Sequence, residues 1–390
     1  MSGSELLRSR TAIAVFFAIN GVMGFSFLPR LAEIQSAARL DDAGLGFVLA
    51  LGTLGGLIAG PFAAFFVQRF GATPTSAAMV FVGLPAFILI GYANSGAMLA
   101  AALMGYLAAD AVMDAAMNTR ALQVQADYRR SIINSFHGWW SLATIAGSAL
   151  GALSAIVGLS LPLFLAGIAA ASCLAAAWAW WWDPRMTARA EHGQPQQRLR
   201  PETVRLMLKG GLAALAVFII LAVTVEDVPI HWGAIYLTDL GQSAVVIGLA
   251  YVLLTSMQTL GRFFGDRLVD RHGQARVIQV SMLIVAVAMS LALMQGSAIA
   301  FVLAAGISGL GVATLFPAAM HAAANFPGVN PAIGIAFVSW FSRVGFVLAP
   351  LAVGLLADGV GIRFGVAVMV IAALGLVVVA GCVDARRGDQ

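Results

Sequence analysis

Residues 106–118 read YLAADAVMDAAMN and lie within a long apolar run. Tyr106, Asp110, Asp114 and Asn118 recur at every fourth position, so an α-helix would carry all four on one face. The other positions of the segment are Ala, Leu, Val and Met. A segment of this kind predicts a membrane-spanning helix, and carboxylates inside such a helix are costly and usually functional.

The rest of the chain has the same apolar character. Of its 390 residues, 61% are hydrophobic and only 10% are charged, whereas a soluble domain carries about 25% charged residues. The composition therefore predicts an integral membrane protein whose partner is the lipid bilayer. No basic segment is interleaved with aromatic residues, so no nucleic-acid partner is expected. The two cysteines lie in apolar runs without CxxC spacing, which predicts neither a disulfide nor a metal site.

Twelve apolar segments are long enough to cross a bilayer, which takes about 20 residues. We expect helices at residues 11–34, 43–67, 73–92, 97–121, 135–157, 161–182, 209–236, 243–263, 275–294, 297–321, 331–356 and 362–383. The long polar connection that follows residue 182 separates six helices from six. We therefore expect an N-terminal bundle at 1–182, a cytoplasmic linker at 183–208 and a C-terminal bundle at 209–390.

The positions of the basic residues predict the orientation. The first apolar segment is too long for a signal peptide and lacks a small-residue cleavage site, so we expect it to be retained. If both termini are cytoplasmic, all 22 Lys and Arg residues fall on the inside except Arg30, Arg39, Arg343 and Arg363. This asymmetry agrees with the preference of Lys and Arg for cytoplasmic loops.

Two short loop segments echo each other, QRFG at 68–71 and DRHG at 270–273, and the fuller second copy reads GDRLVDRHG from residue 265. This copy resembles the cytoplasmic loop motif of the major facilitator superfamily, in which an Asp-Arg-x-Gly turn latches neighbouring helices. In the first copy Gln68 replaces the acidic residue. The resemblance implies a conformational latch formed by Arg69, Gly265, Asp266, Arg267, Asp270, Arg271 and Gly273.

Finer features resemble one branch of that superfamily. SFHG at 135–138, FLPR at 27–30 and Trp232 followed by Tyr236-Leu237 are similar to the bacterial fucose-permease-like and YbjJ-like branch. The resemblance implies an all-α integral membrane protein whose twelve transmembrane helices form two six-helix bundles, the major facilitator fold. It also implies a monomer in the bacterial inner membrane, with both termini in the cytoplasm.

In this superfamily the solute site lies between the two bundles near the midplane. The residues then expected to bind solute are Asn20, Tyr106, Asn118, Asn134, His137, Trp232, Tyr251, Gln258 and Arg343. An ionisable side chain at mid-helix costs roughly 2.5–3.5 kcal/mol if it faces lipid. We therefore expect the five such residues to face protein or water: Asp110, Asp114, Glu226, Asp227 and Arg343.

A proton-coupled carrier needs a group that changes its protonation state near ambient pH. The candidates are Asp110, Asp114, Glu226, Asp227 and His137. Burial in an apolar helix and a like charge one turn away both disfavour an ionised carboxylate. Plainer roles stay open: the aspartates as structural hydrogen-bond anchors, Arg343 as a counter-ion and His137 as a helix-packing donor.

These observations predict a secondary active transporter that moves a small polar, sugar-like organic solute by alternating access. Proton-coupled uptake is the favoured mode, with the proton gradient as energy source and no cofactor. The alternative is a proton-driven efflux pump for drugs or metabolites. Gly138, Gly147 and Gly151 match the start of an antiporter signature, but Ala152 replaces its proline. No nucleophile–base pair, HExxH cluster or Walker motif is found, so neither an enzyme nor ATP-driven transport is expected.

Overall fold

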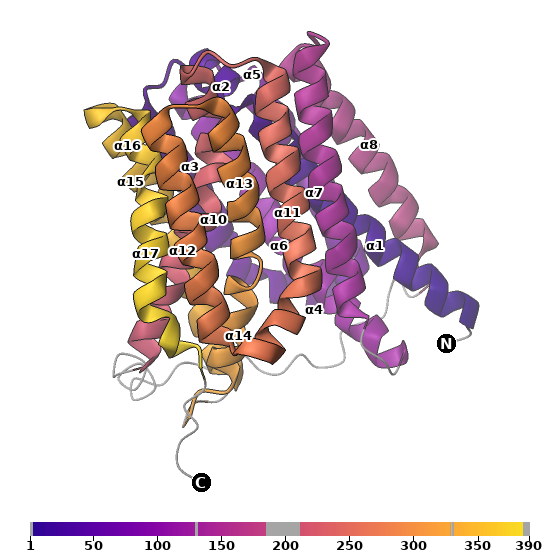
Figure 1. Ribbon diagram of the computed structural model, residues 1–390. Helices are drawn as coiled ribbons and strands as arrows, with labels where there is room; N and C mark the ends of the chain where they lie inside the picture. The colour runs from indigo at the N-terminus through magenta and orange to yellow at the C-terminus, as the bar shows by residue number, and fades with distance from the viewer. Residues whose placement is uncertain (1–2, 129–131, 185–210, 328, 330, 385–390) are drawn as a thin grey trace. The chain divides into compact units, whose positions relative to one another are not determined.

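The computed structural model describes residues 3–128, 132–184, 211–327, 329 and 331–384. Every regular element within these residues is a helix (Figure 1). Twelve of the described helical stretches are long and apolar enough to cross a membrane. The all-α fold with twelve spans is therefore confirmed, while most of the expected linker at 183–208 lies outside the described residues.

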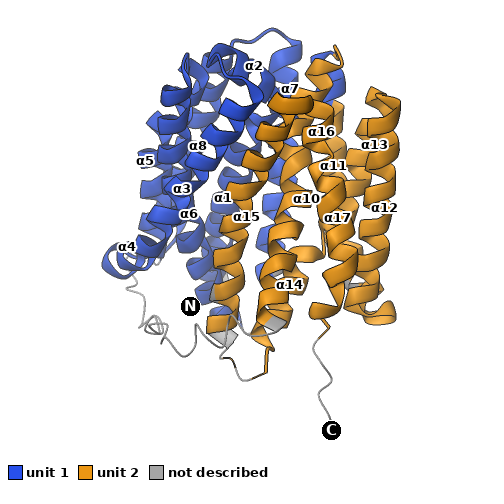
Figure 2. Cartoon of the chain, turned by 90° about the vertical axis from the view of Figure 1, so that its left-hand side faces the viewer, with its two compact units in different colours: residues 1–195, 243–248 blue, residues 196–242, 249–390 orange. Residues whose placement is uncertain are grey.

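The chain divides into two compact units (Figure 2). The first comprises residues 1–195 together with 243–248. Its helices are α1 (Gly3–Ser26), η1 (Leu28–Arg30), α2 (Leu31–Ala37), α3 (Asp42–Ala59), η2 (Gly60–Phe62), α4 (Ala63–Phe70), α5 (Ala72–Tyr92), α6 (Gly96–Tyr128), α7 (Ile133–Ile156) and α8 (Leu161–Trp182).

The second unit comprises residues 196–242 and 249–390. Its helices are α10 (Gly211–Asp239), α11 (Ala244–His272, whose first residues are grouped with the first unit), α12 (Gln274–Gln295), α13 (Ala298–Val312), α14 (Leu315–Ala324), α15 (Pro331–Val360), α16 (Ile362–Val366), α17 (Val368–Val379) and η3 (Ala380–Cys382).

Proline and glycine residues explain where several helices start or change course. Pro61 lies in the short 3₁₀ segment η2 that interrupts the second span between α3 and α4, because proline has no N–H to donate to the helix. Gly71 and Gly273 stand before α5 and α12 with φ angles of 91° and 82°. This left-handed region favours glycine. Both copies of the echoed loop segment thus turn the chain in the same way into the third span of their unit.

Helix packing places the polar stripe of α6 inside the first unit. Helix α6 contacts both α3 and α5, while α1 packs along α7 and also meets α6 and α8. In the second unit α10 packs against α15 and α17, and α12 packs against α13 and α17. The carboxylates predicted on α6 and α10 therefore lie on helices that are surrounded by other helices of their own unit.

Candidate functional site

The stripe residue Asp110 is part of a hydrogen-bond chain across three helices. Asn20 of α1 donates its amide Nδ2 to Asp110 Oδ1 of α6 at 2.7 Å. The indole Nε1 of Trp140, on α7, donates to Oδ1 of the same asparagine, also at 2.7 Å. The sequence singled out Asn20 and Asp110 but not Trp140, which no spacing rule connects to them.

Asp110 borders a small cavity inside the first unit. The cavity has a volume of about 10 Å³, which is close to the room that one water needs. Its lining comes from three helices: Asn20, Met23, Met79, Val80, Gly83, Tyr106, Ala109, Asp110 and Met113. The ring of Tyr106 is buried between Phe27 and Phe87, with ring centroids 6.4 and 5.3 Å away. The half of the stripe that contains Tyr106 and Asp110 therefore combines one carboxylate with an apolar cavity lining that includes three methionines.

The half of the stripe that contains Asp114 and Asn118 has a different environment. Asp114 is exposed, and Asn118 donates to its backbone carbonyl and to its Oδ1 at 2.9 and 3.1 Å. His137 on α7 is exposed, and its ring meets Phe17 edge-on at 5.2 Å between centroids. Asn134 also lies on α7, but its side chain is outside the described part of the chain. Asp110 and Asp114 thus share a helix face without sharing the same partners.

Close packing of α1 against α7 holds this arrangement in place. A Cβ atom at Gly21, next to Asn20, would lie 2.7 Å from the backbone oxygen of Trp140. One at Gly147 would lie 2.8 Å from the backbone oxygen of Val22, and one at Gly151 would overlap the Ser26 carbonyl. These glycines let the two helices approach closely, so packing accounts for two of the three glycines of the partial antiporter pattern.

The second unit also holds a half-buried carboxylate against a neighbouring helix. Gln258 of α11 donates Nε2 to Glu226 Oε1 of α10 at 2.6 Å. The positive charge of Arg262, one turn further along α11, acts on the same carboxylate. A second cavity of about 10 Å³ is lined here by Val225, Glu226, Pro229, Ile230, Leu254, Gln258, Ser308, Gly309 and Val312. Glu226 and Gln258, both predicted from the sequence, are thereby brought together.

The other residues predicted in the second unit lie on α10, α11 and α15. Asp227 is buried and its Oδ1 lies 2.9 Å from His231 Nδ1, an ion-pair distance. Tyr251 of α11 donates its hydroxyl to the carbonyl of Ile230 at 2.5 Å, and Ile230 directly follows Pro229 of α10. Trp232 is fully buried, and its indole N–H has no partner among the described residues. Arg343 is half-buried on α15.

The loop-motif residues occupy the end of α11 and the following turn, except Arg69, which lies in the last turn of α4. Arg69, Arg267, Asp270 and Arg271 are exposed, and the side chain of Asp266 is not among those described. Gly265 is buried, with space for no Cβ because Thr314 Cγ2 would be 2.5 Å from it. A tight approach of α11 to the junction of α13 and α14 is therefore visible, whereas the latch itself stays a prediction.

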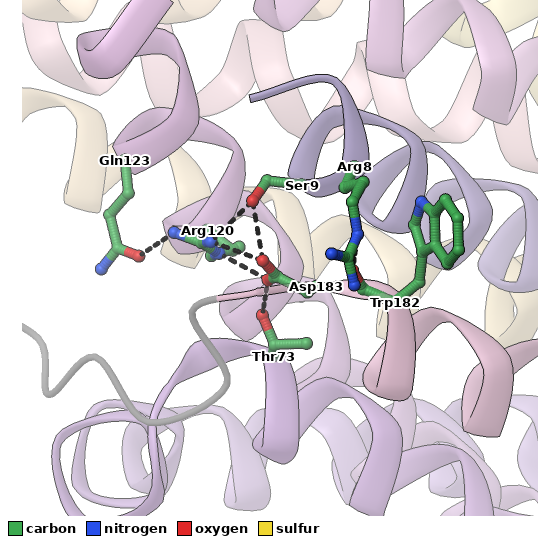
Figure 3. A network of polar contacts seen from close by, with 7 residues as sticks. All are labelled: Arg8, Ser9, Thr73, Arg120, Gln123, Trp182 and Asp183. Carbon is green, nitrogen blue, oxygen red and sulfur yellow. Dashed lines mark hydrogen bonds and ion pairs between the residues drawn. The ribbon is translucent and has the colours of Figure 1, made fainter. Parts of the chain in front are cut away.

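A buried ion pair that the sequence analysis did not find joins four helices of the first unit (Figure 3). Arg120 of α6 donates Nη2 and Nε to the two carboxylate oxygens of Asp183 at 2.8 and 2.9 Å. The Ser9 hydroxyl of α1 and the Thr73 hydroxyl of α5 donate to the same carboxylate at 2.7 and 2.6 Å. Asp183 directly follows α8 and is 0% exposed.

This environment stabilises the charged form of Asp183. Burial by itself raises the pKa of the carboxyl, but hydrogen bonds and charge from Arg120, with the two hydroxyls, outweigh it and hold the pKa below its usual range. Beside the network, Arg8 donates Nε to the Trp182 carbonyl at 3.1 Å, and its guanidinium lies 4.7 Å from the centre of that indole ring. One signal in the sequence could have pointed to the network. Ser9 and Thr73 lie where their expected spans start and Arg120 and Asp183 where theirs end, which the expected topology places on the same side of the membrane.

Twelve membrane-length helices in two units, with buried carboxylates held between helices, define a polytopic membrane protein of the major facilitator fold. Solved structures agree with this class. The nucleoside transporter NupG superposes with a TM-score of 0.77 at 14% identity, over 96% of this chain and 98% of that one. A bacterial homolog to the human lysosomal transporter Spinster gives 0.74 at 15% identity, over 98% and 97%.

Sequence comparisons point in the same direction as the solved structures. The profile of the Major Facilitator Superfamily matches residues 230–388. Membrane protein MosC of Rhizobium meliloti is 27% identical over 387 residues, which cover 97% of this chain and 91% of that one. An uncharacterized MFS-type transporter of Yersinia pestis is 25% identical over 91% of this chain and 90% of that one. Together these similarities support the major facilitator superfamily and point to a membrane transporter rather than an enzyme.

Proposed function

We propose that this chain is a proton-coupled secondary active transporter that takes up a small polar, sugar-like organic solute by alternating access. Its energy source is the proton gradient, with no further cofactor. It acts as a monomer in the bacterial inner membrane, with both termini in the cytoplasm, and belongs to the fucose-permease-like and YbjJ-like branch.

The observation that carries the proposal is the setting of Asp110. A carboxylate inside a membrane span is costly unless neighbouring groups solvate it. Among the described residues, one amide N–H, that of Asn20, reaches one of its oxygens, and a cavity with room for about one water lies beside it. A carboxylate so lightly solvated can exist in both protonation states at moderate cost, as proton coupling requires.

The second unit offers Glu226 and Asp227 as further candidates for the coupling proton. Gln258 of the neighbouring helix donates to Glu226 at 2.6 Å, and His231, one turn along the same helix, lies 2.9 Å from Asp227. The solute contacts are proposed for the nine residues that the sequence analysis names: Asn20, Tyr106, Asn118, Asn134, His137, Trp232, Tyr251, Gln258 and Arg343. Proton-driven efflux has less support, because Gly147 and Gly151 are explained by their contacts with α1.

A ligand screen followed by transport tests the proposal. Purified protein is heated with sugars, sugar acids, amino acids and amines at an acidic and a neutral pH, and with nucleosides because NupG transports them. A compound that raises the melting temperature is then supplied in labelled form to proteoliposomes with an inside-alkaline pH gradient. We expect accumulation that a protonophore abolishes. Accumulation that ignores the protonophore, or that needs the opposite gradient, would contradict proton-coupled uptake.

A further inference from the structure

We infer that Trp140 is a positioning residue that controls the protonation of Asp110 by fixing the orientation of the Asn20 amide. The inference rests on the proposed role of Asp110 as a proton carrier. It adds a residue on a third helix that touches neither the proton nor the solute.

The donor and acceptor chemistry of the three side chains allows only one arrangement. An indole N–H can donate but cannot accept, so the asparagine atom 2.7 Å from Trp140 Nε1 must be the amide oxygen. The amide nitrogen then faces Asp110, and its distance to Oδ1 is also 2.7 Å. The amide orientation, which electron density alone often leaves open, is thus dictated by the neighbouring indole.

This orientation favours one protonation state of Asp110. An amide N–H pointing at a carboxylate oxygen stabilises the ionised form. A protonated Oδ1 would need an acceptor in that place, and Asn20 could supply one only by rotating its amide. Rotation would put the amide nitrogen against the indole N–H, donor against donor. A proton arriving at Asp110 must therefore bind Oδ2, while Oδ1 keeps its bond to Asn20.

The backbone around the chain keeps the three groups in register. Gly21 brings α1 so close to α7 that a Cβ there would lie 2.7 Å from the Trp140 carbonyl oxygen. The Phe25 ring meets the Trp140 ring edge-on at 5.9 Å between centroids. The indole thus contacts α1 through the Phe25 ring and the Asn20 amide, while the backbone of the same tryptophan lies against Gly21.

The charged groups around Asp110 stay the same when Trp140 changes. On α6 itself, the charge of Asp114 acts on Asp110, and Asp110 in turn acts on Tyr106. On α7, His137 lies within one turn of Trp140. The remaining titratable side chains on described elements packed against α6 lie toward helix ends: Glu5, Arg8 and Arg10 of α1, Asp42 of α3, Arg69 of α4 and Tyr92 of α5. None of them is altered by a substitution of the indole N–H.

Infrared titration of the purified protein tests this without any solute. The carboxylic-acid band of Asp110 is identified by its loss in Asp110→Asn. We expect Trp140→Phe to move the midpoint of this band to higher pH by about 1–2 units, the size of one hydrogen bond to a charged group. Trp139→Phe is the matched control, since Trp139 is 53% exposed and its midpoint is expected to equal that of the wild type.

A double-variant comparison shows whether the effect passes through Asn20. Asn20→Ala should raise the midpoint in the same direction, and adding Trp140→Phe to it should change nothing more. If Trp140→Phe does not fold, benzothienylalanine at position 140 keeps the ring shape and replaces only the N–H. An unchanged midpoint in that variant, or the absence of any titrating Asp110 band, overturns the inference. Because no transport is measured, a failure of proton-coupled uptake would be seen separately in the proteoliposome experiment.

Discussion

Asp110 and Asp114 occupy one face of α6, yet their surroundings differ. Asp110 accepts a hydrogen bond from another helix and borders a cavity, whereas Asp114 is exposed and bonded by Asn118 of its own helix. Substitutions that conserve shape separate the two roles. An asparagine at either position can still accept through its amide oxygen, but it cannot bind or release a proton.

Asp110→Asn is expected to fold normally and still to bind and exchange solute, but to lose accumulation driven by a pH gradient. Asp114→Asn should keep more of that accumulation, because its carboxylate is the more solvated of the two. Uptake into proteoliposomes with and without a pH gradient, beside the melting temperature of each variant, makes the comparison. Full pH-driven accumulation in Asp110→Asn would move the coupling role to Glu226 or Asp227.

The ion pair between Arg120 and Asp183 gives a second test at single residues. Asp183→Asn leaves a buried guanidinium without its counter-charge, and breaking a buried pair from one side costs about 3–5 kcal/mol. We expect a clearly lower melting temperature for this variant in detergent. Asp384→Asn is the control, since that exposed carboxylate accepts, within the described part of the chain, only from the Ala275 amide at 3.1 Å; an equal loss in both variants would speak against the buried pair.

The same pair predicts how stability depends on pH. The folded pKa of Asp183 lies below its unfolded value near 3.9. Its contribution is therefore fully present above that value and is lost as the pH falls through the folded pKa. Melting curves should show a loss of stability on the acid side in the wild type, and a weaker acid dependence in Asp183→Asn. An identical loss of melting temperature at acidic pH in both proteins would contradict this account.

At the scale of helices, the crossing of α1 and α7 depends on small residues. Gly147→Ala would place a Cβ 2.8 Å from the Val22 carbonyl oxygen, and because backbone must give way we expect a loss of about 1–3 kcal/mol. Gly138→Ala is the matched control on the same helix, as no atom lies within 4 Å of its Cβ. Melting temperatures of the two variants, measured together, should differ; if Gly147→Ala is as stable as Gly138→Ala, the crossing tolerates more space than the structure indicates.

The helices could be predicted from the sequence because their signal is local. Apolar runs of membrane length located all twelve spans, and the four-residue period placed Tyr106, Asp110, Asp114 and Asn118 on one face. The contact of Asn20 with Trp140 could not be found in this way, because it joins residues 120 positions apart on different helices. The periodic pattern also ended the fourth span at residue 121, whereas α6 continues to Tyr128.

The length of α6 follows from a contact that no local pattern contains. Arg120 reads as a charge at the membrane surface, where a span should stop. In the folded unit Arg120 is 3% exposed and its guanidinium is paired with Asp183, so the helix continues through that position inside the protein. Tertiary contacts of this kind decide which charges end a span and which lie inside the protein.

At the scale of the whole molecule, both units have a hydrogen bond from the start of their third span to an aspartate that follows their last helix. Thr73, the second residue of α5, donates to Asp183 just after the last helix of its unit. Ala275, the second residue of α12, donates its amide to Asp384 just after the last helix of the other unit. Only the first carboxylate is paired with an arginine among the described residues, which makes the first unit the more strongly tied of the two.

The charge asymmetry of the loops predicts the topology of the complete chain. A cysteine at Gln194, outside the described residues, should be labelled only from the cytoplasmic side once Cys173 and Cys382 are replaced. A membrane-impermeant maleimide on intact cells, compared with inside-out vesicles, makes the measurement. Labelling from outside would contradict both the twelve-span topology and the cytoplasmic termini.

The carboxylate of Asp183 also has a consequence for the order of events during synthesis. Its partners Ser9, Thr73 and Arg120 leave the ribosome long before it does. Until the sixth span has been inserted, the guanidinium on α6 lacks its Asp183 counter-charge, and Asp183 cannot yet link the first and last helices of the unit. The first half of the protein should therefore reach its protease-resistant form in a late step, when the residue after Trp182 is delivered, and a nascent chain that stops short of that residue should stay open to digestion.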